Sequence, residues 1–171
     1  MISIQKASLA DAALIAWVAE KTFRETHEAG VPAASIESYV SAKYSVNAIE
    51  EELNDTANIY HIIYYNDQPT GYSKIIFNKP YPAIESSDVT KLDRIYLLKE
   101  FYRLKLGSAL FEFITRLSKE ANQTGMWLYV WKINDRAIHF YTNTGFKAIA
   151  SEDFKISETH SNPNHIMYLK Y

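Results

Sequence analysis

Two segments of the sequence combine residue types that could bind a ligand and act on it. In the first, Ile95 to Phe111, an apolar strand pattern leads through a short loop into a helix whose first turn contains Gly107. The free N–H groups of such a turn and the positive end of the helix dipole attract phosphate. Glycine would let the backbone approach a pyrophosphate closely, and Arg103 and Lys105 could add charge. The alternative is an ordinary strand, loop and helix with two solvated cations.

The second segment, Asn134 to Phe146, has the pattern of a short capped helix with a phenol on one face. Asn134 is placed to cap its start, and Gly145 fits the position that ends it. The hydroxyl of Tyr141 lies about one helical turn beyond Ala137, and a phenol can protonate a thiolate leaving group. The alternative for Tyr141 is a buried core tyrosine.

The elements that must position these segments follow from the hydrophobic pattern. Strands are expected over residues 2–5, 58–65, 70–77, 90–98, 126–131, 146–154 and 165–171. Helices are expected from a cap at Ser8 to Thr26, from caps at Ser35 and Ser45, and over 105–123 and 135–143. Residues 66–69 are expected to form the turn of a hairpin. This order mixes hairpins with helical crossovers, so we expect one α+β (α/β mixed) domain over residues 1–171 with a central mixed sheet.

Composition restricts the chemistry. The chain has 171 residues and no cysteine, which excludes disulfides, thiolate metal sites and a cysteine acyl-enzyme. With 18 basic against 20 acidic residues, a nucleic-acid partner is not expected. No apolar run reaches the roughly 18 to 20 residues of a membrane helix, so we expect a cytoplasmic protein without a membrane partner. His160 and His165 lie in a Ser/Asn/Pro-rich stretch, interpreted as a loop, without the spacing of a known ligand set, so no metal is expected.

Together the two segments resemble the GNAT superfamily of acetyl-CoA-dependent N-acetyltransferases, and the resemblance covers nearly the whole chain. The second segment follows the family pattern N-x-x-A-x-x-F-Y-x-x-x-G-F at every fixed position. The family's pyrophosphate loop reads Q/R-x-x-G-x-G/A. Here Tyr102 takes its first position, Lys105 replaces the usual glycine and Gly107 takes the last.

Short phrases elsewhere are similar to the bacterial spermidine/spermine N-acetyltransferase branch of that superfamily. These phrases are Thr22–Thr26, Tyr39-Val40, Ile49–Leu53, Gly71–Lys74 and Leu92–Leu97. The branch resemblance implies a polyamine as one candidate acceptor.

The family resemblance implies a fold and a set of cofactor contacts. The fold would be a splayed, mostly antiparallel sheet of about seven strands flanked by four or five helices. Main-chain groups of Ile95, Tyr96 and Leu97 would pair with the pantetheine arm, as in strand addition. The pyrophosphate would lie against Tyr102, Arg103, Leu104, Lys105, Leu106, Gly107 and Ser108, with Lys105 at negative φ still presenting its N–H. Asn134 and Ala137 would border the arm, and Tyr141 would stand near the sulfur as general acid.

Acetyl transfer needs an amine that has lost its proton, and the residue that accepts this proton is the least constrained assignment. Asp93 precedes the loop on its strand and could act as base directly or through water. The alternative is a carboxylate in a salt bridge with Arg94 or Lys91. His139 is expected to face away from Tyr141 at the surface.

The amine pocket is expected to draw on the first helices and on the loop after the hairpin. Its candidate residues are Phe23, His27, Tyr44, Tyr81, Glu85 and Asp88, with solvated loop carboxylates as the alternative.

The sequence thus predicts direct transfer from acetyl-CoA to a primary amine of a small molecule. Alternatives are a catalytically silent CoA-binding or protein-interaction domain and an enzyme acting on a protein or peptide amine. Homodimers are common in the resembling family, and a strand near the C-terminus offers an edge for pairing.

Overall fold

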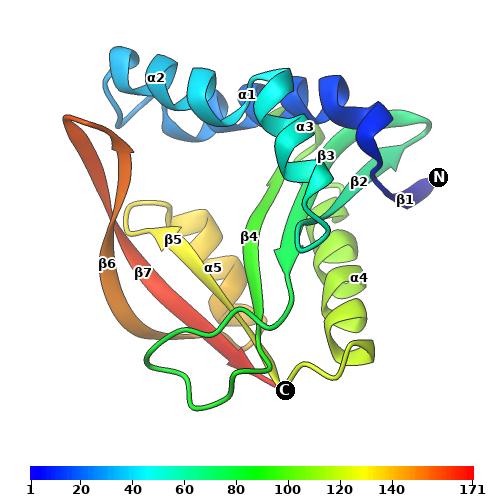
Figure 1. Cartoon of the computed structure of the whole chain (residues 1–171), viewed down its shortest axis with the longest axis vertical. Coiled ribbons are helices and arrows are strands. Elements are labelled where there is room, and N and C mark those ends of the chain that lie inside the picture. The colour runs from blue at the N-terminus through cyan, green and yellow to red at the C-terminus, as the bar shows by residue number, and fades with distance from the viewer.

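A seven-stranded sheet runs through the molecule in the order β1-β2-β3-β4-β5-β7-β6 (Figure 1). The computed structural model describes residues 1–171. Its strands are β1 (Ile2–Lys6), β2 (Ile59–Tyr65), β3 (Gln68–Ile76), β4 (Thr90–Leu97), β5 (Gly125–Trp131), β6 (Lys147–Ser157) and β7 (His160–Lys170). Only β4 and β5 pair in parallel, and all other neighbours are antiparallel. The expected α+β class with a mixed, mostly antiparallel sheet is confirmed.

Five α-helices cover the two faces of this sheet. On one face lie α1 (Ala12–His27), α2 (Ala33–Lys43) and α3 (Val46–Asn54), which gather at one end of the view in Figure 1. On the other face lie α4 (Leu106–Glu120) and α5 (Asp135–Asn143). The segment from Ile95 to Phe111 runs into α4, and the segment from Asn134 to Phe146 contains α5. None of the helices is long and apolar enough to cross a membrane.

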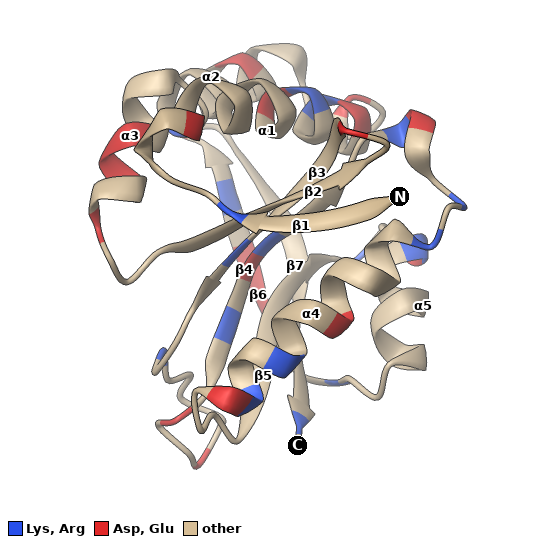
Figure 2. Ribbon diagram, turned by 90° about the vertical axis from the view of Figure 1, so that its right-hand side faces the viewer, with Lys and Arg blue, Asp and Glu red and all other residues tan.

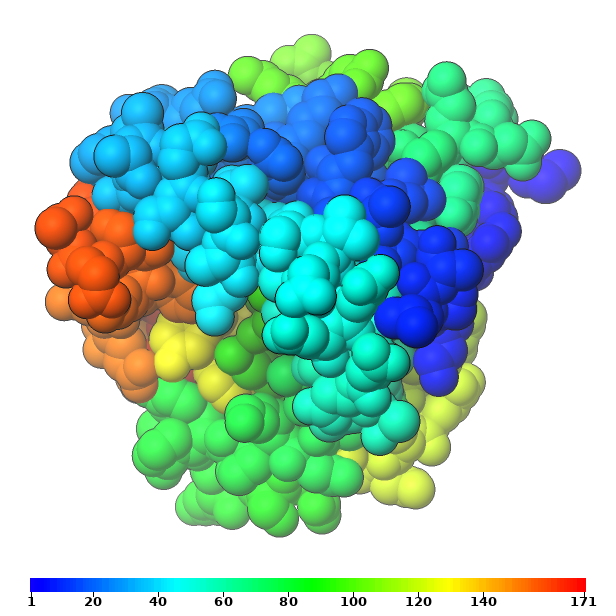
Figure 3. All heavy atoms as spheres, turned by 45° about the horizontal axis from the view of Figure 1, so that its top comes forward, coloured from blue at the N-terminus to red at the C-terminus, as the bar shows by residue number.

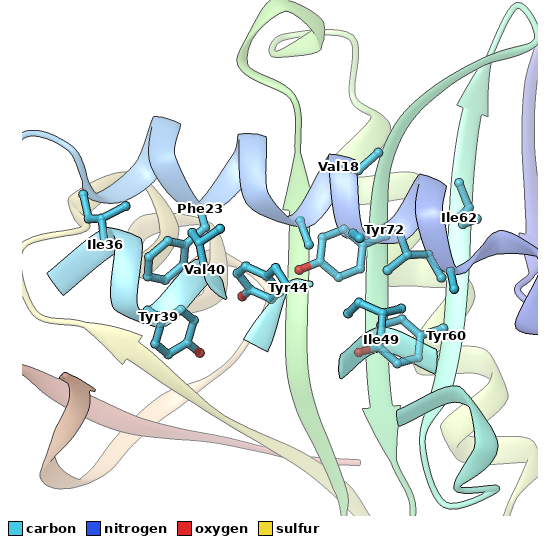
Figure 4. Packing of buried hydrophobic residues seen from close by; sticks show 14 of the residues in the cluster. Val18, Phe23, Ile36, Tyr39, Val40, Tyr44, Ile49, Tyr60, Ile62 and Tyr72 are labelled. Atoms are coloured by element: carbon cyan, nitrogen blue, oxygen red, sulfur yellow. The ribbon is translucent and has the colours of Figure 1, made fainter. Parts of the chain in front are cut away.

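The core is divided by the sheet into two main clusters. Under α1 to α3, aromatic rings dominate: Figure 4 shows Tyr39, Tyr44, Tyr72 and Tyr60 in a row beneath α1, with the hydroxyls of Tyr39 and Tyr44 directed away from that helix. Phe23 stacks on the ring of Tyr39 at 4.4 Å between centroids. A tyrosine has an apolar ring and a polar hydroxyl, so the rings can pack against the helices while the hydroxyls lie on the side away from them.

Several predicted boundaries are wrong. The hairpin turn consists of Asn66 and Asp67 alone, both at positive φ, which is the geometry of a two-residue turn. Helix α2 begins at Ala33 with Pro32 as its cap, so Ser35 lies inside the first turn, whereas Ser45 caps α3 as expected. The stretch with His160 and His165 is not a loop but most of β7, because its polar residues form a long ladder with β6.

Candidate active site

The two parallel strands in the middle of the sheet separate and leave a cavity. β4 pairs with β5 only at Thr90 with Met126 and Lys91 with Trp127, and the strands have no further ladder contacts toward their C-terminal ends. A cavity of about 630 Å³ opens there, lined by residues of both strands and of α1, α2 and α5. Figure 3 shows the opening between the blue and cyan helices, the orange β6–β7 hairpin and the green segment before β4, with β5 in yellow inside.

The separation leaves one edge of β4 without a partner. Leu98 donates its N–H to the Thr70 carbonyl, toward β3. Main-chain groups alternate along a strand, so those of Tyr96 also face β3, and those of Ile95 and Leu97 face the gap. An extended, amide-containing ligand can pair with this edge as an added strand would. The main chain of Tyr96, expected to pair with the ligand, therefore faces β3 instead, the main-chain groups of Ile95 and Leu97 are the ones free on this edge, and Tyr96 is among the residues that line the cavity.

A bulge in β4 decides which side chains face which layer. The register with β3 passes from Lys74 opposite Arg94 to Ile75 opposite Leu92, so Asp93 is the extra residue. A bulge reverses the alternation of side chains on either side of it. Leu92 accordingly packs with the α4 cluster, while Arg94 reaches α3 on the opposite face.

The loop between β4 and α4 has the backbone of an anion site. Arg103 and Lys105 both adopt positive φ, at 71° and 58°, and no side chain caps the first N–H groups of α4. Alternating left-handed residues before a helix N-terminus direct several N–H groups at one point, where they can hold phosphate oxygens. Lys105 is not at negative φ as expected: it takes the left-handed conformation that glycine adopts without strain. The guanidinium of Arg136, on α5, stacks on the Tyr102 ring at 3.3 Å from its centroid and joins the two sides of the gap.

Helix α5 presents Tyr141 to the same cavity. The Asn134 side chain accepts a hydrogen bond from the Ala137 N–H at 3.2 Å, and Gly145 ends the helix at a φ of 101°, both as the pattern predicts. Tyr141 is buried against Phe146 and also lines the cavity. Its hydroxyl has no hydrogen-bond partner within the protein. Burial, and then the nearby Tyr96, raise the pKa of Tyr141, which keeps the phenol protonated and able to donate.

Asp93 lies in the cavity wall within a network of ion pairs. Its carboxylate oxygens lie 2.6 Å from Lys91 Nζ, 3.1 Å from Lys74 Nζ and 3.8 Å from Arg94 Nε. Burial by itself would raise the pKa of Asp93, but the attraction of Lys91, Lys74 and Arg94 outweighs it and holds the pKa below its usual range. A carboxylate of low pKa accepts a proton poorly at neutral pH, so the geometry favours the ion-pair alternative over the role of base.

The expected amine-pocket residues divide into two groups. Phe23, His27 and Tyr44 line the cavity. His27 contacts the Phe23 carbonyl oxygen through Nδ1 at 2.9 Å, which fixes that nitrogen as the donor, and burial lowers its pKa so that the ring is neutral. Tyr81 and Glu85 do not belong to the cavity.

Tyr81 and Glu85 lie outside the cavity because the loop between β3 and β4, which carries them, packs against β5 and β6. There Tyr81 packs on Trp127 at 4.9 Å between ring centroids and donates to Glu152 at 2.5 Å. Asp88, on the same loop, lies outside the cavity too, and its carbonyl accepts from the Thr124 N–H. His139 is exposed, as expected, and contacts Asn143.

Sequence reasoning missed a set of cavity residues that lie far apart along the chain. Glu52 and Lys74 occur in phrases noticed only for their resemblance, yet their side chains form an ion pair at 2.7 Å. A lysine within the otherwise uncharged strand pattern from Gly71 to Ile76 was the available signal. Asn164 was missed because its strand was interpreted as a loop. The structure has no group of three or more His, Asp or Glu residues arranged to hold a metal ion.

Known proteins resemble the chain in sequence and in fold. An uncharacterized N-acetyltransferase of Mycobacterium tuberculosis is 27% identical over 154 residues, which cover 90% of this chain and 94% of that protein. A second, from Lactobacillus delbrueckii subsp. lactis, is 21% identical over 82% of each chain. The crystal structure of the PaiA N-acetyltransferase from Thermoplasma acidophilum in complex with coenzyme A superposes with a TM-score of 0.79 at 23% identity, covering 100% of this chain and 99% of that one.

A ribosomal-protein-S18-alanine N-acetyltransferase from Escherichia coli superposes with a TM-score of 0.70 at 16% identity, covering 99% of this chain and 94% of that one. These likenesses confirm the fold that the split sheet and the two segments suggest. Residues 14–146 match the acetyltransferase (GNAT) family, which is most of the chain. The protein therefore belongs to the GNAT family and is an acetyl-CoA-dependent acyltransferase.

Proposed function

We propose that the protein acetylates a primary amine of a small molecule by direct attack within a ternary complex. One continuous cavity supports this, because it joins the unpaired edge of β4 to a chamber under α1 and α2. Both reactants can then meet without a covalent enzyme intermediate, and the chain has no cysteine to form one.

The proposed reaction assigns one proton to Tyr141. The amine nitrogen attacks the thioester carbonyl carbon, the carbon–sulfur bond breaks, and the thiolate takes the proton of the Tyr141 hydroxyl. The amine proton leaves to solvent, and the phenolate is reprotonated from it. Because burial raises the pKa of Tyr141, the phenol is protonated when acetyl-CoA is bound, so its hydroxyl has a proton to donate to the sulfur as the carbon–sulfur bond breaks.

The main-chain groups of Ile95 and Leu97, the turn from Arg103 to Ser108 and the Asn134 cap are proposed to hold acetyl-CoA. The N–H groups of the turn would bind the pyrophosphate, and the β4 edge would orient the pantetheine arm. Loss of CoA binding in a folded Leu97→Pro variant would test this contact, because proline has no N–H to donate. Leu97→Ile is the matched control, since it keeps the N–H and the size of the side chain.

A thiol-release assay with acetyl-CoA tests the activity, using amino acids, aminoglycosides, peptide N-termini and, because of the branch resemblance, polyamines. Tyr141→Phe is expected to lower turnover at least about tenfold with CoA affinity unchanged by calorimetry. Tyr65→Phe, on β2 outside the cavity, is the control. Unchanged turnover in Tyr141→Phe would remove Tyr141 as the acid. A protein that binds CoA but acetylates no amine would instead support the silent-domain alternative.

The homodimer expected from the sequence remains a proposal about the sheet edge. The free edges of the sheet are β1 and β6, so pairing near the C-terminus would use β6. Light scattering of the purified protein distinguishes one copy from two.

A further inference from the structure

We propose that the acceptor amine carries an anionic oxygen group, a carboxylate or a phosphate, and is not a polyamine. This inference rests on the proposed function and names the class of its substrate. It depends on three features of the cavity wall: a net positive charge, acidic groups whose oxygens all pair with cations of the protein, and a buried amide oxygen without a hydrogen-bond partner.

The wall under α3 holds more positive than negative charge. Lys74, Lys91 and Arg94 face only two carboxylates, Glu52 and Asp93, and Figure 2 shows charges of both signs on the central strands. The side chains of Lys74 and Arg94 are each 8% exposed and that of Lys91 is 19% exposed. The three cations share these two carboxylates, so the wall carries one net positive charge where water is scarce, and an added anion would stabilise such a buried net charge.

Every oxygen of the two carboxylates already pairs with a cation of the protein. Asp93 Oδ1 pairs with Lys91, and Oδ2 pairs with Lys74 and Arg94. Glu52 Oε1 accepts a hydrogen bond from Arg94 at 3.0 Å. Glu52 Oε2 accepts hydrogen bonds from Tyr60 and Arg94 and forms an ion pair with Lys74. A polyamine would therefore compete with the protein's own cations for both groups.

Three aromatic rings next to this wall also have a cation of the protein over them. Lys91 Nζ lies 5.4 Å from the centroid of the Tyr129 ring and 5.5 Å from that of Trp127, and Arg94 lies 5.1 Å from that of Tyr44. These distances are within the range of cation–π contacts. A polycation would therefore compete with Lys91 and Arg94 for these three rings.

The remaining ionisable groups of the cavity do not reverse this balance. Lys43, exposed on α2, adds a positive charge at the rim, and Arg136 stacks on Tyr102 beside the cofactor loop. Glu25 is the third carboxylate that lines the cavity, and it accepts a hydrogen bond from the Lys99 N–H at 2.9 Å, close to the end of β4. His27 is neutral because burial lowers its pKa.

A buried amide supplies a place for the amine itself. Asn164 is 7% exposed and lines the cavity from β7, and its Oδ1 has no hydrogen-bond partner. A buried acceptor without a donor costs stability, and an amine N–H would satisfy it. In the sheet, Lys91 is the partner of Trp127 and Asn164 is the partner of Trp131. The positions of Lys91 and Asn164 are therefore four residues apart along β5, which is about 13 Å of strand. An amine and an anion on one small molecule can reach toward both.

The test compares acceptors that differ only at one end. The probes are 4-aminobutanoate and 6-aminohexanoate, their primary amides, and the diamines of the same chain lengths, with 3-aminopropylphosphonate as the phosphate-like probe and spermidine as the polyamine. We expect kcat/KM for a carboxylate or the phosphonate to exceed that for the amides by about tenfold or more, the usual effect of one charged hydrogen bond, and the diamines to be poorer still.

Variants of Lys91 locate the effect. Lys91→Met should abolish the preference for the anion over the amide, Lys91→Arg should keep it, and Lys147→Met, at an exposed position on β6, should leave all rates unchanged. Equal rates for anion and amide in the native protein, or preference for a diamine or spermidine, would overturn the proposal.

Failure of the proposed function would be seen differently, as binding of CoA with no acetylation of any probe. The inference would then be decided by calorimetric titration of the probes into the CoA-bound protein. Tighter binding of the anions than of the amides would support it, and equal or weaker binding would overturn it.

Discussion

Lys105 stands in the left-handed region of backbone conformation, and replacing it by glycine should stabilise the protein. Its φ is 58°, and it is the residue immediately before α4. A residue with a Cβ atom loses about 1 to 2 kcal/mol in this conformation, whereas glycine loses none but gives up about 0.5 to 1 kcal/mol of chain entropy on folding. The difference predicts that Lys105→Gly raises the free energy of unfolding by about 0.5 to 1 kcal/mol.

Lys105→Ala is the matched variant, because it removes the same charge but keeps the Cβ atom. For a domain of this size, about 1 kcal/mol corresponds to a shift of about 2 to 4 °C in Tm. Thermal unfolding should therefore place Lys105→Gly about 1 to 4 °C above Lys105→Ala. Calorimetric titration with CoA should show a loss of affinity of about two- to fivefold in both, since each removes one exposed charge beside the anion site.

Two results would contradict this reasoning. If Lys105→Gly were no more stable than Lys105→Ala, the left-handed conformation would carry no strain at this residue. If CoA affinity were unchanged in both variants, the Lys105 side chain would have no part in the site. Arg103→Gly provides a second, independent measurement of the same conformational effect, since Arg103 has a φ of 71°.

Further variants test the ion pairs, a buried histidine and a tight strand contact. Asp93→Asn should lower the free energy of unfolding in urea by about 3 kcal/mol, because it leaves buried cations unpaired; a change below about 1 kcal/mol would mean that the network is solvated. Burial, and then Lys6, lower the pKa of His61 from 6.5 to about 4, so the unfolded chain binds a proton below pH 6.5 that the native protein does not bind until about pH 4. Stability should thus fall by about 3 kcal/mol between these pH values, and His61→Phe should remove that loss in a urea series; an identical pH dependence would refute it. Gly71→Ala should destabilise the protein by about 2 kcal/mol and weaken CoA binding, since its Cβ would lie 2.3 Å from the Tyr96 carbonyl oxygen; unfolding and calorimetry that match the parent would contradict this.

Local sequence was enough for the elements whose signals lie within one helix or hairpin. The cap at Asn134 and the helix end at Gly145 depend on residues a few positions apart, and both were predicted correctly. The boundary errors at Ser35 and in β7 arose where a tertiary partner decides the structure. Ser35 is buried and accepts a hydrogen bond from Ser157, 122 residues away, and the polar residues of β7 become a strand by pairing with β6.

By itself, the sequence determined the fold class, the family and two segments whose residues line the cavity, because these depend on spacing within short stretches. Tertiary structure alone decided the charge of the cavity wall. Glu52, Lys74, Asp93 and Arg94 come from three elements, and no local pattern shows that these carboxylates pair with these cations. It also decided that Tyr81 and Glu85 lie elsewhere. Electrostatic character depends on distances across the sheet, and those distances exist only once the chain has folded.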